Sequence, residues 1–201
     1  ACNQNYKRLF YCRYADDFLI GVIGSQEDAL AIKEQFKEFL GKALHLEMSD
    51  EKTKITHGTD KARFLGYDIT TSKNSALLYD KKHQLRKTHT GVIKLYAPRD
   101  KWQRKLMEYG ALSIRYGEDG KEIWDSKHRG NMVHMTDVEI VSTVNAEIRG
   151  MYNYYSIANN ATVIKNFAFI LEYSMYKTYG LKYRKSVYKI QRKFRKNGIF
   201  C

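Results

Sequence analysis

Pro98 is the only proline among 201 residues, and the pattern of the sequence changes at that position. Before it, short apolar and aromatic runs are separated by polar turn-forming residues, which is typical of strands. After it, apolar residues recur every three or four positions, which is typical of amphipathic helices. We therefore predict two domains, residues 1–97 and 98–201. The predicted fold class is α+β: antiparallel hairpins plus a helix, followed by an all-α helical bundle.

The first domain is predicted to combine hairpins with one helix. Residues 9–14 and 18–22 have the pattern of two strands around a polar tip. Ser25 and Asp28 have the spacing of a capping box, and the apolar residues after them predict an amphipathic helix over residues 26–44. Further strands, of which the first two should form a hairpin, are predicted over residues 63–70, 76–79 and 91–96.

The second domain is predicted to be a small bundle of helices. A helix over residues 99–108 follows the proline directly, which is a favoured arrangement. Residues 110–133 contain four glycines and predict an irregular loop. Thr136 and Glu139 form a second capping box before a long helix. The last two helices are expected over residues 164–180 and 184–196.

Positive charge dominates the composition and is concentrated in the second domain. The chain has 35 Lys and Arg residues against 22 Asp and Glu residues, a formal net charge of +13. Residues 98–201 hold 19 of these basic residues but only 10 of the acidic ones, and no acidic residue follows Glu172. Such a bias favours a polyanionic partner, because phosphate contacts release counterions. A merely solubilising cationic surface is the alternative.

Tyrosines interleaved with Lys and Arg in the last 50 residues indicate which polyanion fits. Aromatic faces stack on unpaired bases while cations contact phosphates, which suits single-stranded or irregular RNA. Tyr155 continues the apolar stripe of its helix, so we expect it in the core. The basic residues predicted to bind RNA are Arg149, Lys182, Arg184, Lys185, Arg192, Lys193, Arg195 and Lys196.

Composition argues against several other classes of protein. No apolar run approaches the roughly 20 residues that span a bilayer, and none resembles a secretory leader. Cys2, Cys12 and Cys201 lack the spacing of a zinc site or of a disulfide framework. We therefore expect a protein of a reducing, cytoplasmic setting with no membrane partner.

The sharpest motif is Tyr14-Ala15-Asp16-Asp17, which lies between two apolar strands. A pair of aspartates is also common in ordinary turns. Adjacent carboxylates at the tip of a hairpin repel each other, however, and a divalent cation relieves that repulsion. Hard oxygen ligands suit Mg²⁺. The motif therefore predicts a magnesium site at Asp16 and Asp17, with a structural turn as the alternative.

Residues 10–20, FYCRYADDFLI, resemble the Y-A-D-D palm hairpin of reverse transcriptases, in the form typical of group II intron-encoded proteins. Three further segments agree in order and spacing. Residues 46–53 resemble the segment after the palm helix, and residues 62–67 (ARFLGY) resemble the primer-grip hairpin. Residues 148–155 (IRGMYNYY) resemble the signature of the maturase thumb, called domain X, which is the more specific match. The resemblance covers essentially the whole chain.

The resemblance implies an RNA-directed DNA polymerase that also binds intron RNA and assists splicing. In such polymerases two Mg²⁺ ions clamp the attacking 3′ oxygen and the incoming triphosphate. Asp16 would be a direct ligand, and Asp17 would complete the acidic cluster. The partners would be intron RNA, an RNA template with a DNA primer, and deoxynucleoside triphosphates, in a bacterial cytoplasm. Residues implied to lie near primer, template or nucleotide are Tyr14, Ala15, Lys52, Phe64, Leu65, Gly66 and Tyr67.

One departure from the family pattern limits this interpretation. The family also needs an aspartate on an earlier palm strand and the fingers, and neither is in this sequence. We therefore interpret the chain as the C-terminal part of the palm (residues 1–97) and the thumb, domain X (residues 98–201), which alone should not polymerise. Two alternatives stay open: a non-enzymatic RNA-binding splicing maturase, and a retron-type reverse transcriptase, which should lack the thumb signature.

Overall fold

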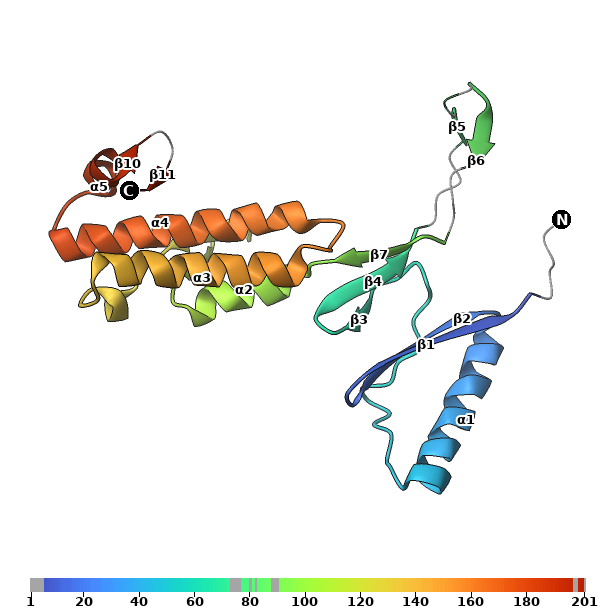
Figure 1. Ribbon diagram of the computed structural model, residues 1–201. Coiled ribbons are helices and arrows are strands. Elements are labelled where there is room, and N and C mark those ends of the chain that lie inside the picture. The colour runs from blue at the N-terminus through green and yellow to red at the C-terminus, as the bar shows by residue number, and fades with distance from the viewer. Residues whose placement is uncertain are drawn as a thin grey trace. The chain divides into compact units, whose positions relative to one another are not determined.

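Two units, each with its own secondary structure, make up the chain in the computed structural model. The first unit covers Ala1–Lys94 and the second covers Leu95–Cys201. Figure 1 shows hairpins and one helix in the first unit and mainly helices in the second. The predicted α+β class is thereby confirmed. The structure describes residues 6–72, 77–79, 81, 83–87, 91–196 and 199–200.

A hairpin and a helix begin the first unit. β1 (Arg8–Tyr14) pairs with β2 (Asp17–Ile23), and α1 (Gln26–Leu44) follows directly. α1 starts at the predicted capping box. The Ser25 hydroxyl accepts the backbone N–H of Asp28 at 3.1 Å, and the Asp28 carboxylate accepts the backbone N–H of Ser25 at 2.9 Å. The predicted hairpin and helix are confirmed.

A second, three-stranded sheet follows α1. β3 (Ala62–Phe64) pairs with β4 (Tyr67–Thr71), and β7 (Ile93–Tyr96) pairs with the other edge of β4. The chain reverses between β3 and β4 within two residues. Leu65 and Gly66 have positive φ angles of 46° and 73°, which such short hairpin turns require.

The predicted pairing of this region was wrong. We expected residues 63–70 to form one strand paired with residues 76–79, but the first of these segments folds back on itself as β3 and β4. β5 (Leu77–Tyr79) pairs instead with β6 (Leu85–Lys87). A turn that begins with leucine gives little signal in an apolar run, since most turns are marked by polar residues. The loop expected at residues 72–75 lies outside the described residues after position 72.

α4 (Ile164–Tyr183) is the central element of the second unit. It packs against α2 (Arg99–Glu108) and α3 (Asp137–Tyr155), as Figure 1 shows. α3 begins at the predicted capping box, where the Thr136 backbone N–H donates to the Glu139 carboxylate at 2.7 Å. The core consists of buried side chains from all three helices, among them Leu106, Ile140, Val144, Phe167, Leu171 and Tyr179.

The irregular loop expected over residues 110–133 was also wrong. β8 (Leu112–Tyr116) and β9 (Glu122–Ser126) form an antiparallel hairpin in that segment. Trp124 on β9 packs against Trp102 on α2, with the ring centroids 5.4 Å apart. The hairpin therefore contributes an aromatic side chain to the helical core. The sequence did not indicate this hairpin, because the glycines in the segment predicted an irregular loop.

The basic helix at the end is shorter than predicted. α5 covers Val187–Phe194, whereas a helix over residues 184–196 was expected. Arg184 has a φ of 50° and ends α4, and β10 (Arg195–Lys196) pairs with β11 (Ile199–Phe200).

None of the helices in the described ranges combines the length and apolar character that spanning a membrane requires. The 3-10 helices are η1 (Gly130–Met132) and η2 (Ala161–Val163).

A buried ion pair crosses the core of the second unit. The two terminal nitrogens of Arg129 donate to the two carboxylate oxygens of Glu147 at 2.7 and 2.8 Å. The side chains are only 7% and 12% exposed. The backbone N–H of Arg129 also donates to the Thr178 hydroxyl at 2.9 Å, which links this segment to α4. Removing one partner of such a pair leaves an uncompensated buried charge.

We expect Glu147→Gln to lower the free energy of unfolding by about 3 to 5 kcal/mol, because Arg129 then loses its counter-ion in the core. Urea denaturation followed by circular dichroism measures this change. The double variant Arg129→Met with Glu147→Leu should recover most of the loss, since it removes both charges.

The matched control is the exposed pair of Arg115 and Asp125 on the β8–β9 hairpin. Asp125→Asn should change the free energy of unfolding by less than about 1 kcal/mol, because solvent screens an exposed pair. If Glu147→Gln costs no more than this control, the Arg129 pair does not stabilise the helical unit as we argue.

Candidate functional site

The two aspartates lie at a two-residue turn between β1 and β2. Tyr14 pairs with Asp17, so Ala15 and Asp16 form the turn and Asp17 is already the first residue of β2. Ala15 has a φ of 50°, as the short turn requires. Its carbonyl accepts a hydrogen bond from Nε of Arg13 at 2.7 Å. The turn therefore holds two consecutive carboxylates at the end of the hairpin.

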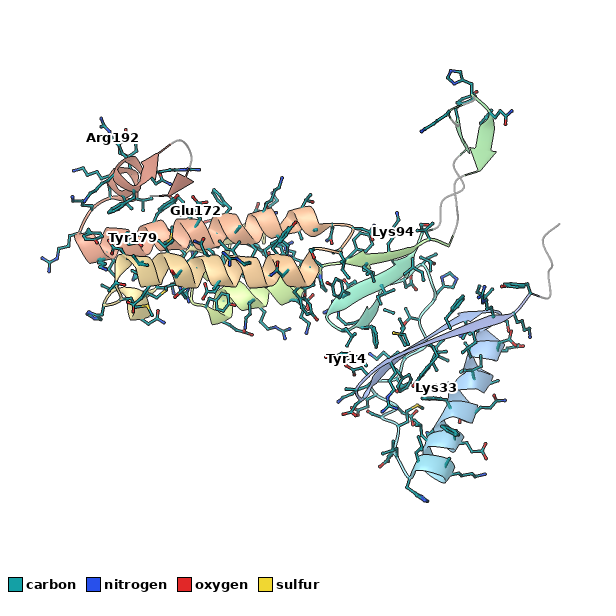
Figure 2. All side chains as sticks on the ribbon, in the orientation of Figure 1. Tyr14, Lys33, Lys94, Glu172, Tyr179 and Arg192 are labelled. Atoms are coloured by element: carbon teal, nitrogen blue, oxygen red, sulfur yellow. The ribbon has the colours of Figure 1, made fainter. Side chains whose placement is uncertain are left out.

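Side chains along this hairpin alternate between two faces. Tyr11 and Phe18 face α1, where their ring centroids lie 6.1 and 4.8 Å from that of Phe36. Tyr14 and Asp17 form a cross-strand pair that belongs to the opposite face of the hairpin. Figure 2 shows Tyr14 at the turn end of the hairpin. Asp17 therefore projects from the face that α1 does not cover.

Both carboxylates are open to solvent. Mg²⁺ in proteins is bound by one or two carboxylates, with water and substrate phosphates completing its octahedral shell. Asp16 and Asp17 fit that requirement by the chemistry of their oxygens. Within the described residues, however, no group of three or more His, Cys, Asp or Glu side chains lies close enough to hold a metal ion. The described residues thus offer two carboxylates and not a closed coordination shell.

The F-L-G-Y segment forms the tight β3–β4 hairpin. Phe64 pairs with Tyr67, which is buried, while Phe64 is half-buried. On the next cross-strand pair, Nε of Arg63 donates to the Asp68 carboxylate at 2.8 Å. β3 also contacts β2 of the acidic hairpin. The structure therefore brings the strands of the two predicted motifs together within the first unit.

Lys52 lies in the loop that follows α1. Nζ of Lys33 on α1 donates to the Thr53 carbonyl at 3.0 Å, and Nζ of Lys37 donates to the Asp50 carboxylate at 2.6 Å. This hydrogen bond from Lys37 lowers the pKa of Asp50, so the carboxylate stays ionised. The loop is fixed to α1 at two points, and the Lys52 side chain between them is exposed.

Most of the basic residues predicted to bind RNA are exposed. α5 buries Ile190 and exposes its opposite side, and Figure 2 shows Arg192 on the side that faces away from α4. The side chain of Lys196 lies outside the described part of the chain. The exposed members of the set are Arg149 on α3, Arg184 and Lys185 between α4 and α5, and Arg192, Lys193 and Arg195 at the end.

Lys182 differs from the others because it is bound within the protein. Its Nζ donates to the Met135 carbonyl at 2.5 Å and to the Asp137 carboxylate at 2.8 Å. The hydroxyl of Tyr183 donates to the same carboxylate. Burial works against ionisation of Asp137, but the hydrogen bonds from Lys182 and Tyr183 outweigh it and lower the pKa of that carboxyl. Lys182 thus ties the start of α3 to the end of α4, which competes with an RNA contact.

A cluster of aromatic rings that was not predicted holds α5 in place. The rings of Tyr179 and Tyr183 stack on each other and on Phe194, with centroid distances of 5.8 to 6.2 Å. The hydroxyl of Tyr179 donates to the backbone carbonyl of Asp137 at 2.8 Å. The four-residue spacing of the two tyrosines placed them on one helix face. Their partner on α5 could not be inferred from spacing within one helix.

Two family models match the chain. The model described as reverse transcriptase (RNA-dependent DNA polymerase) matches residues 1–69. The model described as type II intron maturase matches residues 90–199, more than half of the chain. The maturase match begins at residue 90, a few residues before the division between the two units after Lys94.

Individual relatives agree with these matches. The group II intron-encoded protein LtrA of Lactococcus lactis subsp. cremoris is 38% identical over 187 residues, which is 93% of this chain and 31% of the relative. A putative COX1/OXI3 intron 1 protein of Saccharomyces cerevisiae is 34% identical over 201 residues, 96% of this chain and 23% of the relative. The chain thus spans about a third or less of these curated relatives. It belongs to the type II intron maturase family and carries reverse transcriptase domain sequence in its first unit.

Proposed function

We propose that this chain belongs to a group II intron protein that copies RNA into DNA and binds its own intron RNA to assist splicing. The observation that carries the proposal is the Asp16-Asp17 turn, which lies on a hairpin in contact with the F-L-G-Y hairpin. The match of the first 69 residues to a reverse transcriptase model supports the polymerase part. The match of residues 90–199 to a maturase model supports the splicing part.

In this proposal the acidic turn supplies metal ligands for nucleotide transfer. Asp16 would bind Mg²⁺ directly, and Asp17 on the adjacent strand would complete or orient the acidic cluster. Bound Mg²⁺ would stabilise the negative charge that develops on the attacking and leaving oxygens. The two-residue turn fixes where both carboxylates lie, because the register of the hairpin leaves no freedom to slide. Tyr14 and Ala15 would lie beside the end of the primer–template duplex.

The β3–β4 hairpin would position the primer strand. Phe64 and Leu65 give it a half-buried apolar surface over the buried Tyr67. Gly66 has no Cβ atom, so a nucleic-acid backbone could approach it closely. Holding the 3′ end in line with the triphosphate lowers the entropic part of the barrier. Lys52, exposed on its fixed loop, would contact the triphosphate or protonate the pyrophosphate leaving group.

We expect this chain by itself not to polymerise. The described residues offer the Asp16 and Asp17 carboxylates and no cluster of three metal-binding side chains. Two ions held by two carboxylates would be bound weakly without further ligands. A splicing maturase without polymerase activity is the alternative, and the intact Asp16-Asp17 pair argues against it. Primer extension by the full-length product of the reading frame separates the two hypotheses.

The RNA-binding role rests on the exposed basic residues of the second unit. Intron RNA would contact the solvent side of α5 through Arg192 and Lys193, with Arg149, Arg184, Lys185 and Arg195 as further contacts outside α5. The charges lie on a helix whose apolar side is buried against α4. This arrangement keeps the cations pointing outward and fixes their spacing, which suits a phosphate backbone.

In the full-length protein, Asp16→Ala should reduce primer extension by at least about a hundredfold, because a lost metal ligand removes transition-state stabilisation of several kcal/mol. Affinity for intron RNA should change little, since the basic residues lie elsewhere in the chain. Single-turnover primer extension and filter binding measure the two quantities.

Asp60→Ala is the matched control, because Asp60 is an exposed aspartate in a turn of the same unit. It should extend primers at the parental rate. An Asp16→Ala protein that keeps near-parental extension would show that Asp16 is not a metal ligand of the reaction.

Replacing Arg192 and Lys193 together by glutamine should weaken RNA binding and flatten its salt dependence. Each lost phosphate contact should reduce the slope of log affinity against log salt by roughly 0.7 to 0.9. Titration of intron RNA at several salt concentrations gives the slope. The melting temperature should hardly move, because both side chains are exposed.

The control replaces Lys101 and Arg104, two exposed cations on α2, by glutamine. It removes the same charge from another helix and should leave the slope close to the parental one. Equal effects in both variants would mean that net charge, not the α5 surface, drives binding.

Tyr155→Ala, at a core position that is 4% exposed, should instead lower the free energy of unfolding by about 3 kcal/mol or more. The salt dependence of RNA binding should show no direct change.

A further inference from the structure

α4 carries a row of two aromatic rings and one cation on a single face. Phe169, Tyr173 and Lys177 follow each other at four-residue spacing, which places neighbours along one side of a helix. The rings of Phe169 and Tyr173 are stacked, with centroids 6.2 Å apart and planes 23° from parallel. Nζ of Lys177 lies 5.5 Å from the centroid of the Tyr173 ring. We call these three residues the α4 ladder.

The ladder is fixed at one end and open at the other. Lys177 donates to the backbone carbonyl of Ser126 on β9, so its position over the Tyr173 ring is held by a second element. Tyr173 is half-buried between Lys177 and Phe169. Phe169, the last ring, is 65% exposed. A preorganised ring stack thus ends in a large aromatic surface that faces solvent.

Along α4 itself, the neighbours of Phe169 are mostly polar or charged. Its neighbours at helical spacing are Lys165 and Asn166 on one side and Glu172 and Tyr173 on the other. The first two are exposed, and the Glu172 carboxylate accepts a hydrogen bond from the hydroxyl of Tyr176. Protein-docking sites are usually larger contiguous apolar areas. A single ring among polar and charged neighbours suits a flat partner with polar edges better than it suits a protein surface.

The strip of α4 next to the ladder, which includes Glu172 and Tyr176, lies near the end of the basic segment. Figure 2 shows Glu172 on the side of α4 that carries α5. Burial and the hydrogen bond to Glu172 raise the pKa of Tyr176 to about 12, while the nearby charge of Arg195 acts in the opposite direction. Arg195 is therefore close to Tyr176, one helical turn from Tyr173. The basic segment therefore ends within electrostatic range of this part of α4.

We infer that Phe169 stacks on an unpaired base of RNA, so that the base extends the α4 ladder by one ring. The inference rests on the RNA-binding function proposed above and names the part of the RNA that this surface takes. An unpaired base offers a flat π-face at any sequence, and phosphates on either side of it can reach Lys165 and the basic residues near α5. A base-paired duplex keeps its faces inside the helix and cannot stack in this way.

Two substitutions at one position separate stacking from simple apolar contact. Phe169→Leu keeps an apolar side chain but removes the π-face, whereas Phe169→Trp keeps the π-face. The probes are an unstructured oligoribonucleotide carrying 2-aminopurine and an RNA duplex with the same number of phosphates. Tyr116→Leu, at a 71% exposed position on β8, is the control for loss of an exposed aromatic. All variants are made in the full-length protein.

Phe169→Leu should weaken binding of the single strand by at least about fivefold, with an unchanged salt slope, because stacking involves no counterion release. It should also reduce the quenching of 2-aminopurine, while Phe169→Trp keeps both affinity and quenching. Duplex binding, Tyr116→Leu and the melting temperatures should match the parent.

Parental affinity and quenching in Phe169→Leu would overturn the stacking inference. So would an equal loss on the duplex, or a loss in Phe169→Trp as large as that in Phe169→Leu, which would indicate a role other than base stacking. In each of these cases the loss caused by the Arg192 and Lys193 substitutions would still support the proposed RNA-binding function. Failure of the parental protein to bind either RNA at low salt would instead refute that function.

Discussion

Burial of α4 is the constraint on which the helical unit depends. Ile170, Met175 and Tyr176 lie on different sides of this helix, and all three are buried. One neighbouring helix cannot cover so much of a helical surface, because each partner covers only a stripe of it. α2, α3, α5 and β9 therefore all contact α4. The strip that stays open is narrow, and the exposed ring of Phe169 lies in it.

The packing of this unit also decides which positive charges can meet a partner. Arg129 is bound to Glu147 in the core, and Lys182 is bound to Asp137 at the helix ends. These cations are held in ion pairs within the fold, and removing a buried partner would leave a charge without compensation. The cations on the solvent side of α5 have no such burial. A net charge of +13 therefore overstates the charge that nucleic acid can contact.

In the first unit, tight turns rather than a buried core determine where the functional side chains lie. Only Met48, Tyr67 and Asp68 are buried among its described residues, so a deep core does not fix its side chains. The two motif hairpins instead turn within two residues, and Ala15 and Leu65 both adopt left-handed backbone conformations there. Each such residue costs about 1 to 2 kcal/mol relative to a relaxed conformation. The length of the turn, together with the pairing of β1 and β2, fixes the register and hence where Asp16 and Asp17 lie.

The sequence by itself determined the elements whose signals are local. The capping boxes at Ser25 and Thr136, the α1 stripe and the acidic turn depend on residues three or four positions apart, and they were predicted. Pairings between distant segments were decided only by tertiary structure. The β8–β9 hairpin forms because Trp124 packs on Trp102 in the helical core, and Lys182 is drawn inward by Asp137, 45 positions away. Such contacts leave no periodic trace in the sequence, since they depend on which surfaces the folded chain brings together.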